Sequence, residues 1–378
     1  MPQVTIIGGS VVGLFTAIKL KEKGVNVTVV EEHEKIGVPE RCAGLLSKSG
    51  CKSIGLNVKD CLVNEVKGAK IFSPDNTLIK VEKSSSVAFV VNRKKLDLQL
   101  YEQAKEIGVD FRLGRKLFDK RGNTVFLTHN NRGEMLKTEV LIGCDGPTSK
   151  TRKLMGLTTT QNDFVQGFQA RVEGNFDSKF VEMHYGSFAP NFFAWVIPES
   201  TEIARIGLGC KLGVNPIKRF EWFANKLGLK GKTLSSFNAL IPLREPLNSA
   251  VKDNCLLLGD SAFNTKATTG GGIITGCTAG MIAADTIAKN LKGKGKLNDF
   301  QKNSKQLTKE LKIHFKIHSF LKNLKEEEID NFFTKAKNAG IEEFLSKEGD
   351  MDYPTTYLKK LLFKPRLWSL LPTALKFT

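Results

Sequence analysis

The chain has 378 residues, of which 41% are hydrophobic and 8% aromatic, and its formal net charge is +18. This composition indicates a globular protein with room for two domains, and it excludes an intrinsically disordered chain. No apolar run reaches the roughly 18 residues that a membrane-spanning helix needs, so we expect no membrane span.

Residues 4–31 predict a βαβ unit: a short apolar strand, a glycine-rich turn, a helix and a second, β-branched strand. The turn follows the pattern G-x-G-x-x-G from Gly8 to Gly13, with Ser10 at the position of the second glycine. Such a turn lets the backbone approach a pyrophosphate, and Glu31 at the end of the second strand can accept hydrogen bonds from ribose hydroxyls. The unit therefore predicts dinucleotide binding, with a βα turn that binds no ligand as the alternative.

Residues 32–157 continue the α/β pattern. In chain order we expect a loop over residues 32–50, short strands over 62–91, a helix over 91–108, a hairpin around 130–133 and a buried strand over 138–146. The buried strand ends in Asp145 and Gly146, at the carboxyl edge where open α/β sheets bind ligands. Both residues are candidates for the same ligand, although Asp145 alone could cap a helix.

From about residue 160 to 245 the pattern changes to alternating strands rich in aromatic residues, interrupted by an amphipathic helix over residues 216–227. A sheet with one aromatic face can form the wall of an apolar pocket. The chain then returns to an apolar strand that ends in Gly259 and Asp260, and three glycines at 270–272 precede a helix. The predicted domains are a ligand-binding domain over 1–157 and 251–290, an inserted sheet over 158–250, and a helical basic C-terminal region over 291–378.

The high positive charge favours an anionic partner. No nucleic-acid-binding module accompanies it, so we expect no nucleic acid and favour an anionic membrane surface, with a surface that only keeps the protein soluble as the alternative. Residues 354–378 mix apolar and basic side chains, and we expect them to lie on such a membrane or to dock on the protein itself. The first strand begins almost at Met1, so we expect no signal peptide and a cytoplasmic location, peripheral to the membrane.

Metal binding is not expected. The seven cysteines include no C-x-x-C pair, which argues against a zinc ribbon and a disulfide framework. His314 and His318 lie one helical turn apart, but no acidic general base lies between them, so a solvated helix face is the expected setting.

Three distant segments share one type of feature: the glycine turn with its acid-tipped strand, the strand end at 145–146, and the strand end at 259–260 with its triple glycine. Together with Arg93 and Asp97 at the start of a helix, this set resembles the para-hydroxybenzoate hydroxylase-like flavoproteins over nearly the whole chain. The resemblance implies FAD as the cofactor and an α/β fold (α+β overall). Its expected parts are a Rossmann-like FAD-binding domain, an inserted, mostly antiparallel β-sheet substrate domain and a helical C-terminal region.

Further segments look like the geranylgeranyl reductase branch of that superfamily, which includes the archaeal digeranylgeranylglycerophospholipid reductases. Residues 39–44 (PERCAG) resemble its Pro-x-x-Cys-x-Gly loop, residues 193–198 (FAWVIP) its Tyr-x-Trp-x-Phe-Pro-Lys strand, and residues 268–273 (TTGGGI) its Thr-Gly-Gly-Gly-Ile segment. The strand also resembles that of flavin halogenases. The departures from the reductase pattern are Phe193 for tyrosine, Ile197 for phenylalanine, Glu199 for lysine and Ala267 for proline.

The resemblance implies roles for individual residues. Those expected to hold FAD are Gly8, Gly9, Ser10, Val12, Gly13, Glu31, Glu32, Arg41, Cys42, Ala43, Gly44, Arg93, Asp145, Gly146, Gly259, Asp260, Gly270, Gly271, Gly272 and Ile273. Those expected at the reacting centre are Cys42, Trp195, Phe193 and Tyr185. Cys42 either adjusts the protonation of the flavin, donates a hydrogen bond or a proton, or is an inert thiol. The aromatic residues either line the cavity or only build the sheet core. Arg93 could equally form a surface ion pair.

The implied function is that of an FAD-dependent oxidoreductase acting on CH–CH groups, which saturates isolated C=C bonds of geranylgeranyl chains on membrane lipids or quinones. A flavin monooxygenase or halogenase acting on an aromatic substrate is the first alternative. A non-catalytic flavin-bound protein that binds lipid or transfers electrons is the second. The one readable dinucleotide fold is assigned to FAD, so the electron donor is NADPH bound transiently or a ferredoxin.

Overall fold

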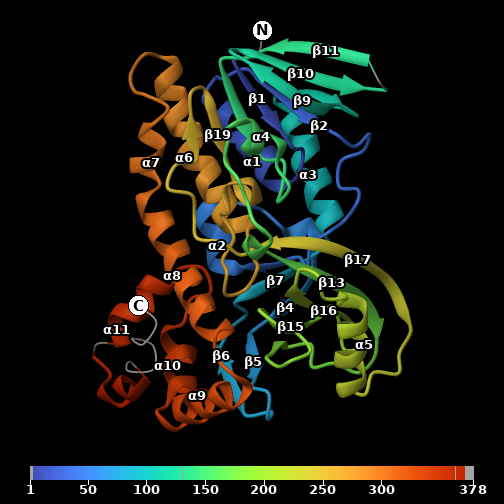
Figure 1. The fold of residues 1–378 in the computed structure, drawn as a ribbon, viewed down its shortest axis with the longest axis vertical. Coiled ribbons are helices and arrows are strands. Elements are labelled where there is room, and N and C mark those ends of the chain that lie inside the picture. Colours follow the sequence, from blue (N-terminus) through green and yellow to red (C-terminus); the bar gives the residue numbers. More distant parts are fainter. Residues whose placement is uncertain (1–2, 131, 362, 371–378) are drawn as a thin grey trace.

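The computed structural model describes residues 3–130, 132–361 and 363–370. In spatial order, the strands of its first sheet are β18 (Val251–Lys252), β19 (Cys255–Leu257), β12 (Val140–Gly143), β1 (Val4–Ile7), β2 (Val27–Glu31) and β8 (Asp110–Leu113). The described strand pairs of this sheet are parallel, except that β18 runs antiparallel to β19. The first sheet lies near the N-terminus, at the top of the view in Figure 1.

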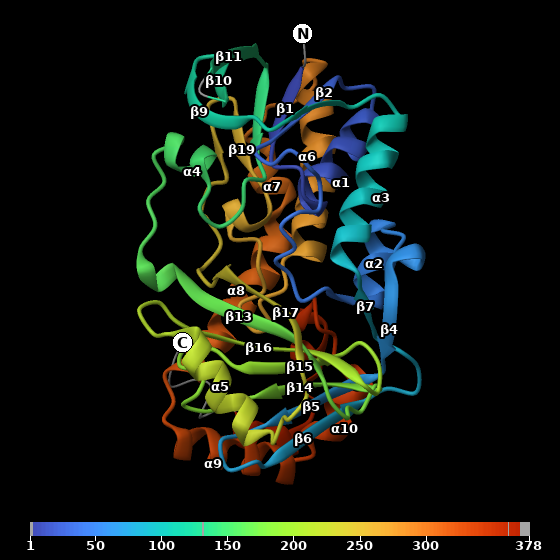
Figure 2. The same cartoon turned by 90° about the vertical axis from the view of Figure 1, so that its right-hand side faces the viewer.

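Two layers cover the first sheet (Figures 1 and 2). The layer on one face consists of α1 (Val11–Lys21), α3 (Arg93–Glu106) and α6 (Ile273–Leu291). The layer on the other face consists of α4 (Lys150–Leu154) and a small antiparallel sheet of β9 (Lys116–Arg121), β10 (Thr124–His129) and β11 (Arg132–Lys137). Val4 and Ile6 pack in the cluster with the helices, whereas Ile7 packs in the cluster with β9 and β10. Because β1 is buried on both faces, its sequence is continuously apolar rather than alternating.

A second, longer sheet fills the lower half of the molecule (Figure 2). In spatial order its strands are β17 (Thr233–Pro242), β13 (Phe164–Glu173), β16 (Ile203–Lys211), β15 (Ala194–Pro198), β14 (Phe180–His184), β5 (Gly68–Phe72) and β6 (Leu78–Glu82). Its described pairs are antiparallel except that β14 runs parallel to β5. Ala194 and Val196 pack with helix α5 (Pro216–Lys226), so Trp195 and Ile197 project from the opposite face, toward the first sheet.

The long sheet takes strands from both sides of the expected boundary at residue 157. Strands β5 and β6 come from residues 68–82, within the segment expected to belong wholly to the ligand-binding domain, yet β5 pairs with β14 from Phe180 to His184. This pairing joins residues more than a hundred positions apart, and no local pattern specifies it. The inserted domain is therefore completed by an earlier part of the chain.

A further small sheet and the C-terminal helices connect the two halves. The small sheet consists of β3 (Leu45–Ser47), β7 (Ala88–Val91) and β4 (Leu62–Val66), and beside it lies α2 (Lys48–Ile54). The C-terminal helices are α7 (Asp299–Asn303), α8 (Lys305–Lys322), α9 (Glu326–Asn338), α10 (Ile341–Glu348) and α11 (Pro354–Leu361). Short 3-10 turns are η1 (Lys59–Cys61), η2 (Gln161–Asp163), η3 (Gly259–Ala262) and η4 (Pro365–Leu370). The C-terminal helices, orange to red in Figure 1, run along one side of the molecule from the first sheet to the long sheet. There, α9 and α10 contact β6.

The end of the chain packs partly on the protein itself. The backbone N–H of Thr355 at the start of α11 donates to buried Glu310 of α8 at 3.0 Å. Phe363, in contrast, is 82% exposed. Leu362, residues 371–378 and the side chain of Trp368 lie outside the described residues, so the expected membrane contact of this segment is not tested there. Within the described part of the chain, no helix combines the length and the hydrophobicity that a membrane crossing requires.

The expected solvated setting of His314 and His318 is wrong. Both imidazoles are buried, with exposed fractions of 3% and 7%, because α8 packs between the loop before α6 and the segment that follows α10. Thr268 Oγ1 lies 2.6 Å from Nδ1 of His314, and the carbonyl oxygen of Asp352 lies 3.2 Å from its Nε2. Among the residues that the structure describes, no group of three His, Cys, Asp or Glu side chains is arranged to hold a metal ion.

Candidate functional site

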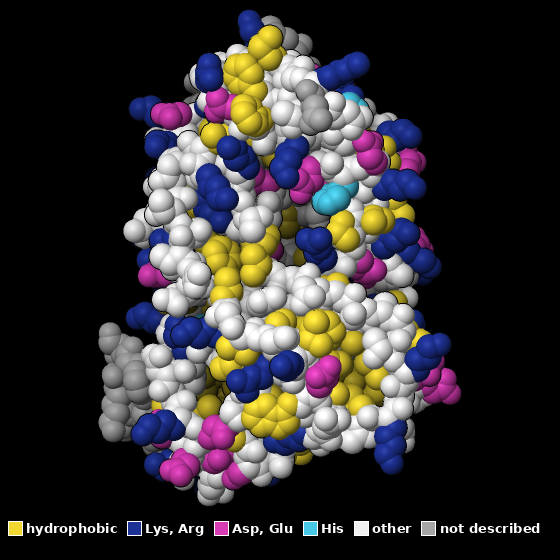
Figure 3. All heavy atoms as spheres, turned by 45° about the vertical axis from the view of Figure 1, so that its right-hand side comes forward, with side chains coloured by type: hydrophobic (Ala, Val, Ile, Leu, Met, Phe, Trp, Pro, Cys, Tyr) yellow, Lys and Arg dark blue, Asp and Glu magenta, His cyan; other side chains and the backbone are white. Residues whose placement is uncertain are grey.

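One large cavity, of about 890 Å³, lies where the first sheet meets the long sheet. Figure 3 shows a hollow between the upper and lower halves of one face, with hydrophobic side chains gathered below it and lysine and arginine around it. The cavity wall combines the turn after β1, the loop before β3, the start of α6, and the face of the long sheet that is turned away from α5. Segments from across the sequence thus meet at one place.

The turn after β1 needs glycine because chain segments pass directly against it. Gly8 has φ +110°, and a Cβ there would lie 2.3 Å from the carbonyl oxygen of Cys144 at the end of β12. A Cβ on Gly13 would lie 2.0 Å from the carbonyl oxygen of Gly8. Ser10 sits at the exposed tip of the turn, where its hydroxyl lies 3.3 Å from Asp97 Oδ1 and 3.3 Å from Nη2 of Arg93. The serine that departs from the glycine pattern therefore joins a polar network.

Two helix N-termini open into this cavity. Helix α1 begins after Ser10 and helix α6 begins after Gly272, and neither N-cap residue makes a side-chain cap. Both starts belong to the cavity lining. The first N–H groups of a helix have no partner within the helix, and the helix dipole is positive at that end. Each N-terminus is therefore suited to a phosphate or to the polar edge of a ring.

A buried ion pair stands beside the first of these helices. Arg93 and Asp97, one turn apart at the start of α3, are 7% and 6% exposed, and Nη2 of the arginine donates to the carboxylate oxygens at 3.1 and 3.2 Å. The Nε of Arg93 is buried and has no partner among the described residues. Burial lowers the pKa of Arg93, but nearby Cys42 and Asp97 outweigh it and raise that pKa above its ordinary value. For the acid, burial has the opposite effect: it raises the pKa of Asp97, although nearby Arg93 acts to lower that pKa.

Asp260, the acid that follows β19, lies beside the start of helix α6. Asp260, in η3, accepts a hydrogen bond from Thr265 Oγ1 at 3.0 Å, and burial raises the pKa of its carboxyl. A Cβ on Gly272 would lie 3.0 Å from Asp260 Oδ1, so the glycine keeps the backbone within reach of the carboxylate. Gly270 has φ +71°, a conformation that favours glycine. This corner places the Asp260 carboxyl beside the start of α6.

The expected FAD residues divide into two groups. Those that line the cavity are Ser10, Val12, Gly13, Arg41, Cys42, Ala43, Gly44, Arg93, Gly146, Gly259, Asp260, Gly270, Gly271, Gly272 and Ile273. Those outside its lining are Gly8, Gly9, Glu31, Glu32 and Asp145. The second group lies in the glycine turn and at or just after the ends of β2 and β12.

Three carboxylates outside the lining have protein partners. Glu31 Oε2 accepts from the backbone N–H of Gly9 at 2.7 Å and so braces the glycine turn. Asp145 accepts from Ser149 Oγ at 2.6 Å and from the backbone N–H of Thr151 at 2.9 Å, so it ties the end of β12 to α4. Glu32 pairs at the surface with a lysine on β9.

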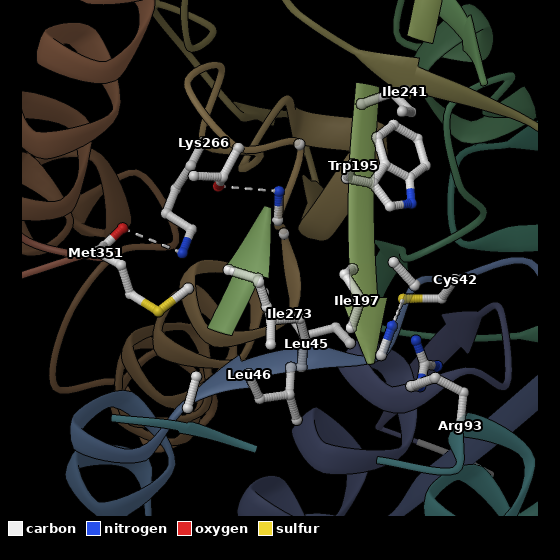
Figure 4. A pocket seen from close by; sticks show the side chains of 18 of the residues that line it. Cys42, Leu45, Leu46, Arg93, Trp195, Ile197, Ile241, Lys266, Ile273 and Met351 are labelled. Atoms are coloured by element: carbon white, nitrogen blue, oxygen red, sulfur yellow. Dashed lines mark hydrogen bonds between the residues drawn. The ribbon is translucent and has the colours of Figure 1, made fainter. Parts of the chain in front are cut away.

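The apolar end of the cavity is built on β15 and the residue before it. Phe193, Trp195 and Ile197 share one face of the strand and line the cavity, while Trp195 Nε1 donates to Gln169 Oε1 at 2.9 Å. In Figure 4, Trp195 and Ile197 stand one below the other along the strand. Tyr185 does not line this cavity: it lies behind Phe193, with ring centroids 6.0 Å apart, and lines a separate pocket of about 220 Å³. Burial raises the pKa of its hydroxyl.

Cys42 lies between the polar and apolar parts. Its side chain is half-buried and lines the cavity, and its Sγ accepts from the backbone N–H of Gly44 at 3.4 Å. In Figure 4 the guanidinium of Arg93 points toward it, with Trp195 and Ile197 on the neighbouring strand. A thiol in this position can reach a polar cofactor edge and an apolar substrate at once.

The sequence reasoning missed the residues that close the cavity from the C-terminal side. Lys266 is 4% exposed, and its Nζ pairs with Asp352 and donates to the carbonyl oxygen of Met351 at 3.3 Å. Met351 and Lys266 face each other across this wall in Figure 4. Asp350 and Tyr357 line the cavity as well. The pair spans 86 positions, so no spacing in the sequence could have signalled it.

The chain matches known proteins along most of its length. The model of the FAD-binding domain family matches residues 1–191. An uncharacterized protein of Methanocaldococcus jannaschii is 32% identical over 95% of this chain and 94% of its own length. The digeranylgeranylglycerophospholipid reductase of Methanothrix thermoacetophila is 28% identical over 75% of this chain and 77% of its own length. The crystal structure of a geranylgeranyl bacteriochlorophyll reductase-like protein of Thermoplasma acidophilum has a TM-score of 0.83, covers 98% of this chain and 99% of its own, and is 21% identical.

The fold, the cavity and these matches define a class of protein: an FAD-dependent oxidoreductase. The chain belongs to the FAD-binding domain family, and the resemblance to geranylgeranyl reductases within it is confirmed by the relatives. It is a flavin-dependent reductase. The residues present fit the cofactor, because the cavity offers open helix N-termini, a turn in which a Cβ would collide with the backbone, and the unpartnered Nε of Arg93.

Proposed function

We propose that this reductase saturates isolated C=C bonds of geranylgeranyl chains carried by membrane lipids or quinones. The observation that carries the proposal is the meeting, in a single cavity, of the helix N-termini suited to FAD with the apolar face formed by Phe193, Trp195 and Ile197. A polyprenyl chain is long and purely apolar, so it matches this face. Relatives named digeranylgeranylglycerophospholipid reductase support the same substrate class.

Reduction of an isolated double bond needs a hydride at one carbon and a proton at the other. When bound, reduced FAD supplies the hydride. The polypeptide positions the two partners: the starts of α1 and α6 with Arg93 and Asp260 hold the cofactor, and Trp195 and Ile197 hold the chain against it. An unactivated alkene gains most from this positioning, because fixing two reactants in one geometry removes much of the entropic barrier.

Cys42 is the proposed proton donor. Its Sγ lies at the junction of the polar and apolar parts of the cavity, and a thiol that gives its proton to the second carbon regains one from solvent. Beside it, Trp195 satisfies its one polar atom with Gln169 Oε1, so the indole presents an apolar surface to the chain.

The direct experiment is reduction of a digeranylgeranyl phospholipid under anaerobic conditions. Purified protein loaded with FAD is reduced with dithionite, the lipid is added in detergent, and the mass of the lipid product is measured by mass spectrometry. Each saturated bond adds two hydrogens, so we expect a series of products whose masses differ by two hydrogen atoms. Turnover of an aromatic substrate to a hydroxylated or halogenated product in air, with no change in the lipid, would instead establish monooxygenase or halogenase chemistry. No turnover of either would support the non-catalytic alternative.

The proposed electron donor is NADPH or a ferredoxin. Both are tested by adding each to the oxidised holoenzyme without oxygen and following the loss of flavin absorbance. A nicotinamide donor needs only transient access to the cavity, whereas a ferredoxin needs a protein surface, for which the net charge of +18 favours an acidic partner.

For the membrane, we propose contact through the exposed part of the C-terminal segment. Phe363 is almost wholly exposed, and Lys359, Lys364 and Arg366 are exposed around it. Such a combination of one apolar and several basic side chains suits an anionic bilayer. Replacement of Phe363 and Lys364 by serine should reduce sedimentation with phosphatidylglycerol vesicles. Equal sedimentation of the variant would refute this contact.

A further inference from the structure

Arg205 joins the long sheet to the loop that carries Cys42. The residue lies on β16 and is 6% exposed. Its Nε donates to Glu199 Oε1 at 2.7 Å, and its Nη1 donates to the carbonyl oxygens of Ala43 at 2.7 Å and of Val91 at 2.9 Å. One guanidinium therefore satisfies a carboxylate of the sheet and two backbone carbonyls that belong to other parts of the fold.

The Cys42 loop rests directly on this guanidinium. Gly44 has φ +68°, and a Cβ there would lie 2.4 Å from Nη1 of Arg205 and 2.5 Å from the carbonyl oxygen of Val91. The backbone N–H of Gly44 donates to Cys42 Sγ, and its carbonyl oxygen accepts from the backbone N–H of Val91 at 2.8 Å. The position of the sulfur thus depends on a short chain of contacts that ends at Arg205.

The same guanidinium sets the start of α3. Val91 is the last residue of β7, and Asn92 follows it as the N-cap of α3, accepting from the backbone N–H of Lys95 at 2.9 Å. Arg93 is the first residue of the helix. A carbonyl held two residues before Arg93 restricts the direction in which that side chain leaves the backbone.

Glu199 completes the arrangement and explains a departure from the reductase pattern. The carboxylate is held by Arg205 and by Arg171 Nε, the latter at 2.6 Å. The Arg171 side chain is 41% exposed, and its ion pair is with Glu199, whereas Arg205 also donates to the Cys42 loop. Glu199 thereby orients Arg205, while Arg171 offers a matched control that shares the carboxylate but not the loop.

We propose that Arg205 is a positioning residue that fixes Cys42 and Arg93 relative to the long sheet. In this arrangement the wall that receives the substrate and the loop beside the flavin move as one unit. The coupling depends on the arginine fork, which binds the Glu199 carboxylate and the carbonyl groups of Ala43 and Val91 at once. The inference rests on FAD binding and holds whichever substrate is reduced.

The test compares Arg205→Lys, Arg205→Met and Arg171→Met as FAD-loaded proteins. The first readout is the rate at which iodoacetamide labels Cys42, measured by peptide mass spectrometry. The second is the dissociation constant of FAD. We expect both Arg205 variants to be labelled about tenfold faster and to bind FAD about tenfold more weakly, because the loss of the hydrogen bonds to Ala43 and Val91 is worth about that factor. Arg171→Met should match the wild type in both.

The lysine variant separates positioning from simple charge pairing. A lysine keeps a cation opposite Glu199 but lacks the planar fork, so it should restore thermal stability without restoring slow labelling. Wild-type labelling of Arg205→Lys would overturn the proposal, and so would Arg171→Met labelling as fast as Arg205→Met. If Arg205→Met fails to fold, the lysine variant alone decides. A failure of prenyl reduction would leave these two readouts unaffected.

Discussion

Lys266 and Asp352 form a buried ion pair that fastens the C-terminal region to the loop before α6. The lysine is 4% exposed and the aspartate 0%, and Asp352 also accepts a hydrogen bond from Ser47 at the start of α2. Three regions of the sequence therefore meet at one carboxylate. The pair stands in the wall of the flavin cavity, since Lys266 lines it.

Removal of one partner of this pair should destabilise the protein strongly. Lys266→Met leaves a buried carboxylate without its cation, and the expected loss in the free energy of unfolding is about 3–5 kcal/mol. The double variant Lys266→Met/Asp352→Leu should recover much of that loss, because no unpaired charge remains. Urea denaturation followed by circular dichroism measures both. Equal losses in the single and double variants would contradict this account.

The two buried histidines, His314 and His318, should make the folded protein less stable at acidic pH. Burial, with nearby Lys266, lowers the pKa of His314 to about 4, and burial with nearby Lys322 lowers that of His318 to about 4. In the unfolded chain both imidazoles bind a proton below about pH 6.5, whereas in the folded protein they do so only below about pH 4. Stability should therefore fall as pH drops from 6.5 to 4, by up to about 3 kcal/mol for each histidine.

The control for this effect is the variant His314→Gln/His318→Gln. Between pH 6.5 and 4 it should lose less stability than the wild type, since neither glutamine titrates. Denaturation midpoints at several pH values give the two slopes. Identical slopes would assign the acid sensitivity to other groups.

Loss of Arg93 should weaken FAD binding. Arg93→Met removes a cation from the cavity and leaves Asp97 buried without its partner, so we expect the dissociation constant of FAD to rise about tenfold or more. The matched control is Glu22→Gln, which breaks the surface pair of Lys19 and Glu22 and should change stability by less than about 1 kcal/mol. Flavin fluorescence quenching measures the affinity. Unchanged affinity of Arg93→Met would remove the residue from the cofactor site.

Replacement of Trp195 should affect the substrate rather than the cofactor. Trp195→Ala enlarges the apolar part of the cavity and removes the bond to Gln169, so we expect kcat/KM for a prenyl lipid to fall about tenfold or more with FAD retained. Trp222→Ala is the control, because that side chain is 45% exposed on α5, on the other side of the sheet. Equal kinetics of the two variants would place Trp195 outside the substrate site.

Cys42→Ala should slow reduction of the double bond without loss of FAD. The thiol is proposed to supply a proton, a role that contributes about a hundredfold or more where it operates. The single-turnover rate of reduced, FAD-loaded enzyme with prenyl lipid is the measurement. A rate equal to that of the wild type would show that the proton comes from elsewhere.

Local features of the fold could be read from the sequence with good accuracy. The βαβ unit, the helix over residues 93–106, the strand over residues 140–143 before Asp145 and the helix after Gly272 lie where the patterns predicted them. These elements are encoded by periodicity, capping and glycine placement within short windows. The same windows carry the motifs that indicated FAD, and the cofactor is confirmed by the match to the FAD-binding domain family.

The tertiary structure decided which of the candidate residues share the cavity. Asp145 and Glu31 accept hydrogen bonds from protein N–H groups and do not line the cavity, and Tyr185 lies behind Phe193 in a separate pocket. Lys266 and Arg205 could not be found from the sequence, since each acts on a partner that lies 86 or more positions away. Spacing within the chain reports which face of an element a side chain occupies. Only packing reports what stands opposite that face, because contacts between distant segments depend on how whole elements pair and close upon one another.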